Sequence, residues 1–395
     1  MQSLASGSWL SRERTLRIAI ILGLLSIASL MFLFATSRGT LDWMGRPLGT
    51  DFSNVWTAGR MALEGRAADA WNWGLHFAVQ REFHGDPAVP TFGWHYPPPF
   101  LLLASALATL PYVGALVVWQ LATIIPLAAM IHRLVPSRET LLLVLAAPVT
   151  LVCLTHGHNG FLTALLLGGG LALIDRRPFL AGLLFGCLIY KPQFGLILPP
   201  LLLAMRSWRG IAGACTSAGL LVAITLAVWG WPVWQAFIDS LPLTKAVVIE
   251  QGATGWHKIM SPFSAVRAWG GSVGLAYAVQ LLFVLAAVAA SVFGALRSDR
   301  PESRNAIVCA AVLISTPYVL DYDLVVLLPA LAFLWRDGQR HGFLPWDATL
   351  MALVWAAPLF ARQVADYTLI PLGLLSVIAV AAVALRRLRA SPSRR

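Results

Sequence analysis

The residue whose type and position best suit it for catalysis is Asp51, which opens the segment 51–60, Asp-Phe-Ser-Asn-Val-Trp-Thr-Ala-Gly-Arg. A carboxylate can hydrogen-bond an attacking hydroxyl group and take its proton as a new bond forms, which is general-base chemistry. The helical periodicity of residues 54–64 supports a second interpretation, in which Asp51 or Ser53 caps the N-terminus of an interfacial helix. The spacing alone leaves both interpretations open.

Lys191 is the most conspicuous cation, within Tyr190-Lys191-Pro192-Gln193 at the tip of an expected helical hairpin. A lone ammonium group among apolar residues is costly unless it extends to the membrane surface or meets an anion. Phosphate binding and extension to the surface are therefore equal alternatives for Lys191. His257 and Lys258, in the aromatic-rich loop 231–271, are further candidates for holding an anionic head group.

Other polar pairs have weak metal-binding signatures. His156 and His158 flank a glycine in a tight turn, and two histidines without a third ligand do not define a metal site. We expect His158 instead to donate a hydrogen bond to a phosphate or a sugar hydroxyl. Asp321 and Asp323 form a D-x-D pair, of which one member is suited to cap a helix. We therefore expect no metal ion and no other cofactor.

Tyr96 precedes three consecutive prolines, residues 97–99. Proline fixes φ and ends helices, so this sequence is suited to a rigid re-entry of the chain into the membrane. The apolar run 101–110 is too short to span a bilayer and is expected to be re-entrant or interfacial. The Tyr96 ring either belongs to an aromatic belt or stacks on a sugar.

These residues belong to a chain whose composition is typical of a polytopic membrane protein. Of its 395 residues, 58% are hydrophobic and only 12% are charged, whereas a soluble protein carries about 25% charged residues. The apolar runs recur along the chain, so we predict one all-α transmembrane domain over residues 1–395. Apolar length predicts about twelve transmembrane helices, at 16–36, 113–132, 139–155, 160–174, 179–191, 193–205, 210–230, 272–296, 305–319, 324–335, 347–361 and 368–385.

The arginine distribution predicts how these helices are oriented. With the N-terminus in the cytoplasm, 19 of the 29 Lys and Arg residues fall in short cytoplasmic loops or tails, at 12–17, 133–138, 176–177, 206–209, 297–304, 336–340 and 386–395. The positive-inside rule therefore places both termini in the cytoplasm. Basic loops beside anionic lipids also explain the net charge of +11 without a nucleic-acid partner. Two long segments, 37–97 and 231–271, are left on the outer face with most of the polar variety, and the chemistry is expected there.

In their order along the chain, the motifs resemble glycosyltransferase family 87, which includes polyprenyl-phosphomannose-dependent α-mannosyltransferases. The resemblance covers about residues 48–330. It is carried by residues 51–60 with Leu63-x-Gly65, Tyr96-Pro97-Pro98, His158-Asn159-Gly160, Arg177-Pro178 with Gly182, Tyr190-Lys191-Pro192-Gln193, and Thr316-Pro317-Tyr318 with Tyr322-Asp323. The chain departs from the family pattern at residues 157–159, which leaves the preference for donor and acceptor open.

This resemblance implies a GT-C fold, which is a multi-helix bundle with a long first extracytoplasmic loop, here residues 37–97. It also implies an inverting, metal-independent transfer, with Asp51 at the position of the catalytic base. We therefore expect a glycosyltransferase of the bacterial inner membrane with its active site on the periplasmic face. The donor would be a polyprenyl-phosphate-linked hexose, mannose being favoured, and the acceptor a glycolipid or envelope glycan amid the membrane lipids.

Four residues are expected to hold the donor phosphate: Lys191, His257, Lys258 and His158. The expected substrate-binding residues are Asn54, Arg60, Tyr96, Asn159, Gln193, Tyr318 and Asp323. Other functional classes also fit a polytopic chain. A transporter or a lipid-linked-sugar flippase would place polar residues deep in the spans, whereas the ionisable residues here gather at span ends and in outer loops. A purely structural subunit would need no outer carboxylate.

Overall fold

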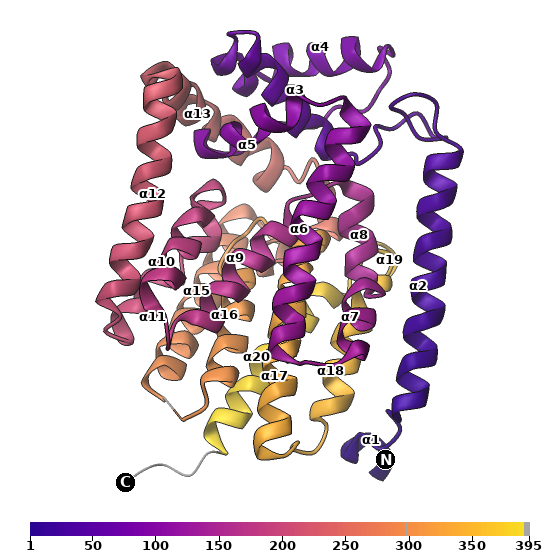
Figure 1. Ribbon diagram of the computed structural model, residues 1–395, viewed down its shortest axis with the longest axis vertical. Coiled ribbons are helices and arrows are strands. Elements are labelled where there is room, and N and C mark those ends of the chain that lie inside the picture. The colour runs from indigo at the N-terminus through magenta and orange to yellow at the C-terminus, as the bar shows by residue number, and fades with distance from the viewer. Residues whose placement is uncertain (298, 391–395) are drawn as a thin grey trace.

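The computed structural model describes residues 1–297 and 299–390, and within them the regular structure is helical. Most helices run along the long axis of the molecule (Figure 1). Among these described residues, four helices are long and apolar enough to cross a membrane: α2 (Arg12–Ala35), α6 (Tyr112–Leu134), α12 (Trp208–Trp229) and α15 (Val273–Leu296). The prediction of an all-helical membrane protein is confirmed.

Two bent helix pairs raise the number of candidate spans to six. The first pair, α7 (Arg138–Leu145) and α8 (Pro148–His156), bends by 50°. The second joins α18 (Asp347–Ala356) and η7 (Ala357–Leu359) to α19 (Ala361–Thr368) with a bend of 75°. The structure thus supports four to six crossing helices by length and composition, while the number twelve stays a prediction.

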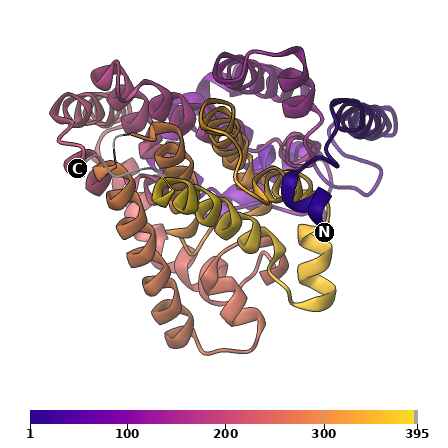
Figure 2. The same cartoon turned by 90° about the horizontal axis from the view of Figure 1, so that it is seen from below.

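Shorter helices occupy the remaining predicted segments: α9 (Gly160–Leu173), α10 (Pro178–Gly186), α11 (Leu198–Ala204), α16 (Pro301–Ile314), α17 (Leu327–His341) and α20 (Leu372–Arg389). The centre of the bundle is α16, in which all residues from Glu302 to Ile314 are buried. It packs against α15, α17 and α20. By contrast, α2 buries only Ala19 and stands at the edge of the molecule (Figure 2).

One end of the bundle carries a cap of short helices (Figure 1). Residues 37–97 form much of it, as α3 (Phe52–Leu63), η1 (Ala67–Trp71) and α4 (Trp73–His84), joined by α5 (Pro98–Ala108) and α13 (Trp231–Thr244). α5 packs so closely on α3 that a Cβ at Gly59 would lie 2.0 Å from the carbonyl oxygen of Ala104. The opposite end holds α1 (Gln2–Ser6) and the C-terminal end of α20 (Figure 1). The segment 37–97 therefore folds into helices that cover the bundle.

The four cysteines differ in how far they are exposed. Cys153 and Cys309 are buried and Cys187 is half-buried, but Cys215 on α12 is exposed. An apolar helix at the rim of a membrane bundle directs such a side chain outward because lipid, not protein, surrounds it.

Candidate active site

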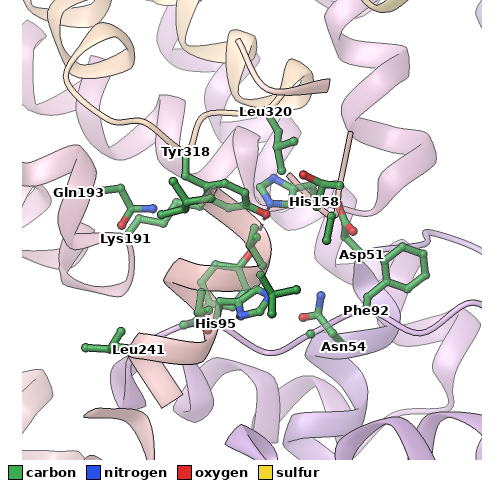
Figure 3. A pocket seen from close by; sticks show the side chains of 18 of the residues that line it. Asp51, Asn54, Phe92, His95, His158, Lys191, Gln193, Leu241, Tyr318 and Leu320 are labelled. Atoms are coloured by element: carbon green, nitrogen blue, oxygen red, sulfur yellow. Dashed lines mark hydrogen bonds between the residues drawn. The ribbon is translucent and has the colours of Figure 1, made fainter. Parts of the chain in front are cut away.

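A cavity of about 460 Å³ lies between the cap and the bundle. It is lined by eight of the predicted site residues: Asp51, Asn54, Tyr96, His158, Lys191, Gln193, Tyr318 and Asp323. Lys191 and Gln193 lie on one side of it, and Asp51 and Asn54 lie on the other (Figure 3). The fold thus brings together residues that are separated by more than 250 positions in the chain.

Asp51 is positioned by the turn that follows α8. Its backbone N–H donates a 3.0 Å hydrogen bond to the carbonyl oxygen of His156. Gly157 continues that turn with φ +62°, and a Cβ there would lie 2.6 Å from the Cβ of Phe52. Glycine is therefore required both for the left-handed backbone and for the close approach of α3. The neighbouring Phe52 is fully buried and fixes the start of α3.

The capping interpretation of this segment is not supported. Asp51 precedes α3 at the N-cap position, but its side chain accepts no capping hydrogen bond. The Ser53 hydroxyl instead contacts Gln80 Oε1 at 3.3 Å and His84 Nε2 at 2.9 Å, both on α4. The Asp51 carboxylate is therefore left to line the cavity.

The electrostatics of Asp51 suit a base. It lies outside the membrane-crossing helices, and no ion pair joins it to any residue that the structure describes. Burial raises the pKa of Asp51 above its ordinary value, while the nearby His156 and hydrogen bonding by Tyr322 lower it. A raised pKa means that the ionised carboxylate binds a proton more readily, which increases its strength as a base.

Lys191 and Asp323 form a buried ion pair in the wall of the cavity. The Lys191 ammonium lies 2.7 Å from Asp323 Oδ1, and the two side chains are 6% and 4% exposed. The second Asp323 oxygen accepts the backbone N–H of Leu320 at 3.1 Å. Full pairing of this kind offsets the cost of burying both charges. Of the two alternatives for Lys191, extension to the surface is therefore wrong.

His158 contributes hydrogen bonds and no charge. Its ring stacks on Tyr322 with 3.5 Å between centroids, and its Nε2 lies 3.2 Å from the Tyr96 hydroxyl. Burial, followed by the charge of Lys191, lowers the pKa of His158 well below its ordinary value. The ring is therefore neutral near pH 7, and its Nδ1 has no partner among the described residues.

Four predicted site residues do not line this cavity. Arg60 is exposed and pairs at 2.6 Å with Glu64, the residue that directly follows α3. His257 lies 3.4 Å from Asp366 and lines a different cavity. Asn159 is buried beside His158 with no partner for its amide among the described residues. Lys258 is near enough for its charge to act on Asp51.

The D-x-D pair is occupied by protein cations. Asp321 accepts the backbone N–H of Tyr322 at 3.0 Å and bonds to Arg362 on α19. Asp323 forms an ion pair with Lys191. Within residues 1–297 and 299–390, no group of three or more His, Cys, Asp or Glu residues is arranged to hold a metal ion.

Two residues near the site were not predicted as part of it. His95 lines the cavity, with its Nδ1 3.2 Å from Thr244 Oγ1, and burial lowers the pKa of His95 to about 4. Its position beside Tyr96 in the outer segment was an available signal. Arg362 also lies 3.4 Å from His156 Nε2. The sequence around Arg362 did not predict that contact, because the contact depends on the 75° bend between residues 347–359 and α19.

A comparison with known families matches most of the chain's central segment. A family model for glycosyltransferase family 87 matches residues 94–317, more than half of the chain. The chain belongs to glycosyltransferase family 87. The matched segment includes Tyr96, His158 and Lys191, whereas Asp51 precedes it. Together with the crossing helices, the family makes this chain a membrane glycosyltransferase. No curated protein and no solved structure matches it.

Proposed function

We propose that this family 87 chain transfers a hexose, with mannose favoured, from a polyprenyl-phosphate-linked donor to a glycolipid or envelope glycan. Asp51 acts as the general base. The observation that supports this role is the contrast between the two carboxylates in the cavity. Asp323 is neutralised by Lys191, while Asp51 has no ion pair among the described residues and lies on the side of the cavity opposite Lys191 (Figure 3).

In the proposed reaction, Asp51 takes the proton of an acceptor hydroxyl while the hydroxyl oxygen bonds to the anomeric carbon of the donor. The bond between that carbon and the phosphate oxygen breaks, and the polyprenyl phosphate leaves with the bonding electron pair. Attack opposite the leaving group inverts the anomeric configuration. Burial favours this step because it raises the proton affinity of Asp51.

The departing phosphate gains negative charge, so a cation and hydrogen-bond donors must stabilise it. Lys191 is the cation in the cavity wall, and the donor phosphate would compete with Asp323 for its ammonium group. Neutral His158 and Gln193 line the same cavity and can donate hydrogen bonds. His257 and Lys258 are left out of this phosphate site because neither lines the cavity.

The proposed setting is a GT-C bundle of about twelve spans in the bacterial inner membrane, with the active site on the periplasmic face. The cap that covers the cavity lies at the end opposite to α1 and the C-terminal end of α20 (Figure 1). This separation supports the proposal, since the arginine-rich segments favour a cytoplasmic position for both termini. A donor flipped to the outer leaflet would then reach Asp51.

The sharpest test is Asp51→Asn, which keeps the shape of the side chain but removes the base. The matched control is Glu82→Gln, at an exposed carboxylate on α4 that does not line the cavity. In proteoliposomes supplied with polyprenyl-phosphate mannose and a glycolipid acceptor, Asp51→Asn should lower the transfer rate by about 10²- to 10⁴-fold. Wild-type transfer by Asp51→Asn would contradict the role. Translocation of labelled lipid-linked sugar without any transfer product would favour the transporter alternative.

A further inference from the structure

A second cavity, of about 300 Å³, lies between η5 (Trp256–Lys258) and α19. His257 from η5 and Asp366 from α19 both line it, and their Nδ1 and Oδ1 atoms are 3.4 Å apart. Trp256 and the apolar side chains of Met260 and Leu369 form other parts of its wall. An aromatic ring beside a carboxylate and an imidazole can accommodate a sugar, because the ring packs against C–H groups and the polar atoms bind hydroxyls.

Both polar side chains retain unused hydrogen-bonding capacity. Among the residues that the structure describes, the contact between these two side chains joins Nδ1 to Oδ1 and leaves Nε2 of His257 and Oδ2 of Asp366 without a partner. The Asp366 side chain is exposed, so a ligand can reach it. A carboxylate repels a phosphate or another anionic head group but accepts hydrogen bonds from hydroxyls. The chemistry of this cavity therefore favours a neutral, hydroxyl-rich ligand.

The rim of the second cavity is suited to the membrane surface. Trp269 and Tyr367 are 61% and 84% exposed, and Trp269 Nε1 donates a 2.9 Å hydrogen bond to the carbonyl oxygen of the cavity residue Leu369. The crossing helix α15 begins only four residues after Trp269. Exposed Trp and Tyr at the end of a crossing helix mark the interface between lipid and water. A ligand in this cavity can therefore keep its tail in the bilayer.

Elements around the second cavity also contact residues beside the first cavity. One turn before its carboxylate, α19 carries Arg362, which lies 3.4 Å from Nε2 of His156. The carbonyl oxygen of His156 accepts the backbone N–H of Asp51. On the η5 side, the backbone N–H of Met260 donates a 2.7 Å hydrogen bond to the carbonyl oxygen of Val319, next to the first cavity. Thus α19 contacts the turn that holds Asp51, and the segment that follows η5 is bonded to residue 319 beside the first cavity.

We propose that the second cavity binds the neutral sugar head group of a membrane-anchored lipid, and that this lipid is the acceptor. His257 and Asp366 bind hydroxyls of the head group, Trp256 packs against its ring, and the lipid tail lies beside the exposed aromatic rim. A further hydroxyl of the head group then extends toward Asp51. The acceptor role rests on the proposed function, whereas the binding of the head group does not.

Binding is tested without a donor, using the full-length protein in phosphatidylcholine nanodiscs. The probes are a monohexosyl diacylglycerol, phosphatidylglycerol as an anionic lipid, and a methyl hexoside without a lipid tail. We expect the wild type to prefer the glycolipid, and Asp366→Ala and His257→Ala each to weaken its binding by about tenfold or more. The matched control is Asp239→Ala, an exposed acid on α13 bonded to Gln235 at 2.8 Å, which should bind like the wild type.

Three binding results would overturn the inference: unchanged glycolipid binding in Asp366→Ala, a preference for phosphatidylglycerol, or equal affinity for the methyl hexoside. In a transfer assay, Asp366→Ala should raise KM for the glycolipid and leave KM for the donor unchanged. Transfer with an unchanged acceptor KM would overturn this inference alone. A wild-type protein that binds the glycolipid through Asp366 but transfers no sugar would contradict the proposed function and not the binding of the head group.

Discussion

The two ends of the bundle hold their acids in different ways. At the end that contains α1 and the C-terminal end of α20, Asp337 and Asp347 are fully buried, and both bond to Arg387. Arg300 is a second cationic partner of Asp337, and Arg386 is a second cationic partner of Asp347. At the cap end, Asp323 is paired with Lys191, but Asp51 has no ion pair among the described residues.

This difference separates acids that stabilise the fold from an acid that can react. For a buried carboxylate with two cationic partners, the ion pairs offset the cost of burying the charge. Ionising a carboxylate that is partly removed from water and has no such partner costs free energy, so this carboxylate takes up a proton more readily. The arginine-rich end is therefore expected to matter for stability, and the cap end for catalysis.

The largest effect on stability is expected at Arg387. Arg387→Ala leaves Asp337 and Asp347 buried with one fewer cation each, which should lower the free energy of unfolding by about 3–5 kcal/mol. Asp51→Asn should not destabilise the protein, because it removes a charge that burial disfavours. Thermal unfolding in detergent measures both variants, and equal melting temperatures for the two would break the comparison.

Lys191 is expected to matter both for stability and for transfer, and its variants separate these two roles. Lys191→Ala leaves Asp323 unpaired and should cost about 3 kcal/mol of stability, besides raising KM for the donor. Adding Asp323→Asn removes the unpaired charge, so the double variant should recover stability but not donor use. The unfolding temperature of the double variant measures the recovery of stability, and its KM values for donor and acceptor measure the loss of donor use. A change confined to the acceptor KM would contradict a phosphate role for Lys191.

The pH dependence of transfer reports on Asp51 directly. Burial raises its pKa, and the base must be ionised, so activity should rise with pH at higher values than for an exposed aspartate. Tyr322→Phe removes a hydrogen bond that lowers the pKa of Asp51 and should move this acid limb to still higher pH. Profiles of kcat/KM against pH for both proteins measure the shift. A shift to lower pH would contradict the assignment.

The contribution of Asp51 to stability falls as pH rises, whereas its activity as a base increases. Because the folded-state pKa of Asp51 is raised, its contribution to stability is complete below the unfolded pKa and is lost as pH rises through the folded pKa. Asp51→Asn removes this loss. The stability gain from Asp51→Asn should therefore grow with pH over that range, as measured by unfolding at several pH values.

The smallest effect is expected at Arg60. Its ion pair with Glu64 is exposed on the outer face of α3 and does not line the cavity. Such pairs contribute little in water, so Arg60→Ala should change stability by less than about 0.5 kcal/mol and leave transfer unchanged. A large loss of transfer would show that substrate extends beyond the cavity to this face.

Much of the site could be predicted because its signals are local. Asp51, Tyr96, His158 and Lys191 each lie in a short motif at the edge of an apolar segment, and all four line the cavity. His257 carried a similar signal but lines the neighbouring cavity. A motif shows that a residue is suited to bind a ligand, but it does not show which cavity the residue faces.

The sequence by itself determined the apolar segments and the helices that they form, because hydrophobic length and periodicity act over neighbouring residues. It also singled out Asp51 as a candidate base. Only the tertiary structure decided that Lys191 pairs with Asp323, 132 positions away, and that Asp51 remains without an ion pair among the described residues. Which charges meet depends on how distant helices pack, and that packing has no signature in the local order of residues.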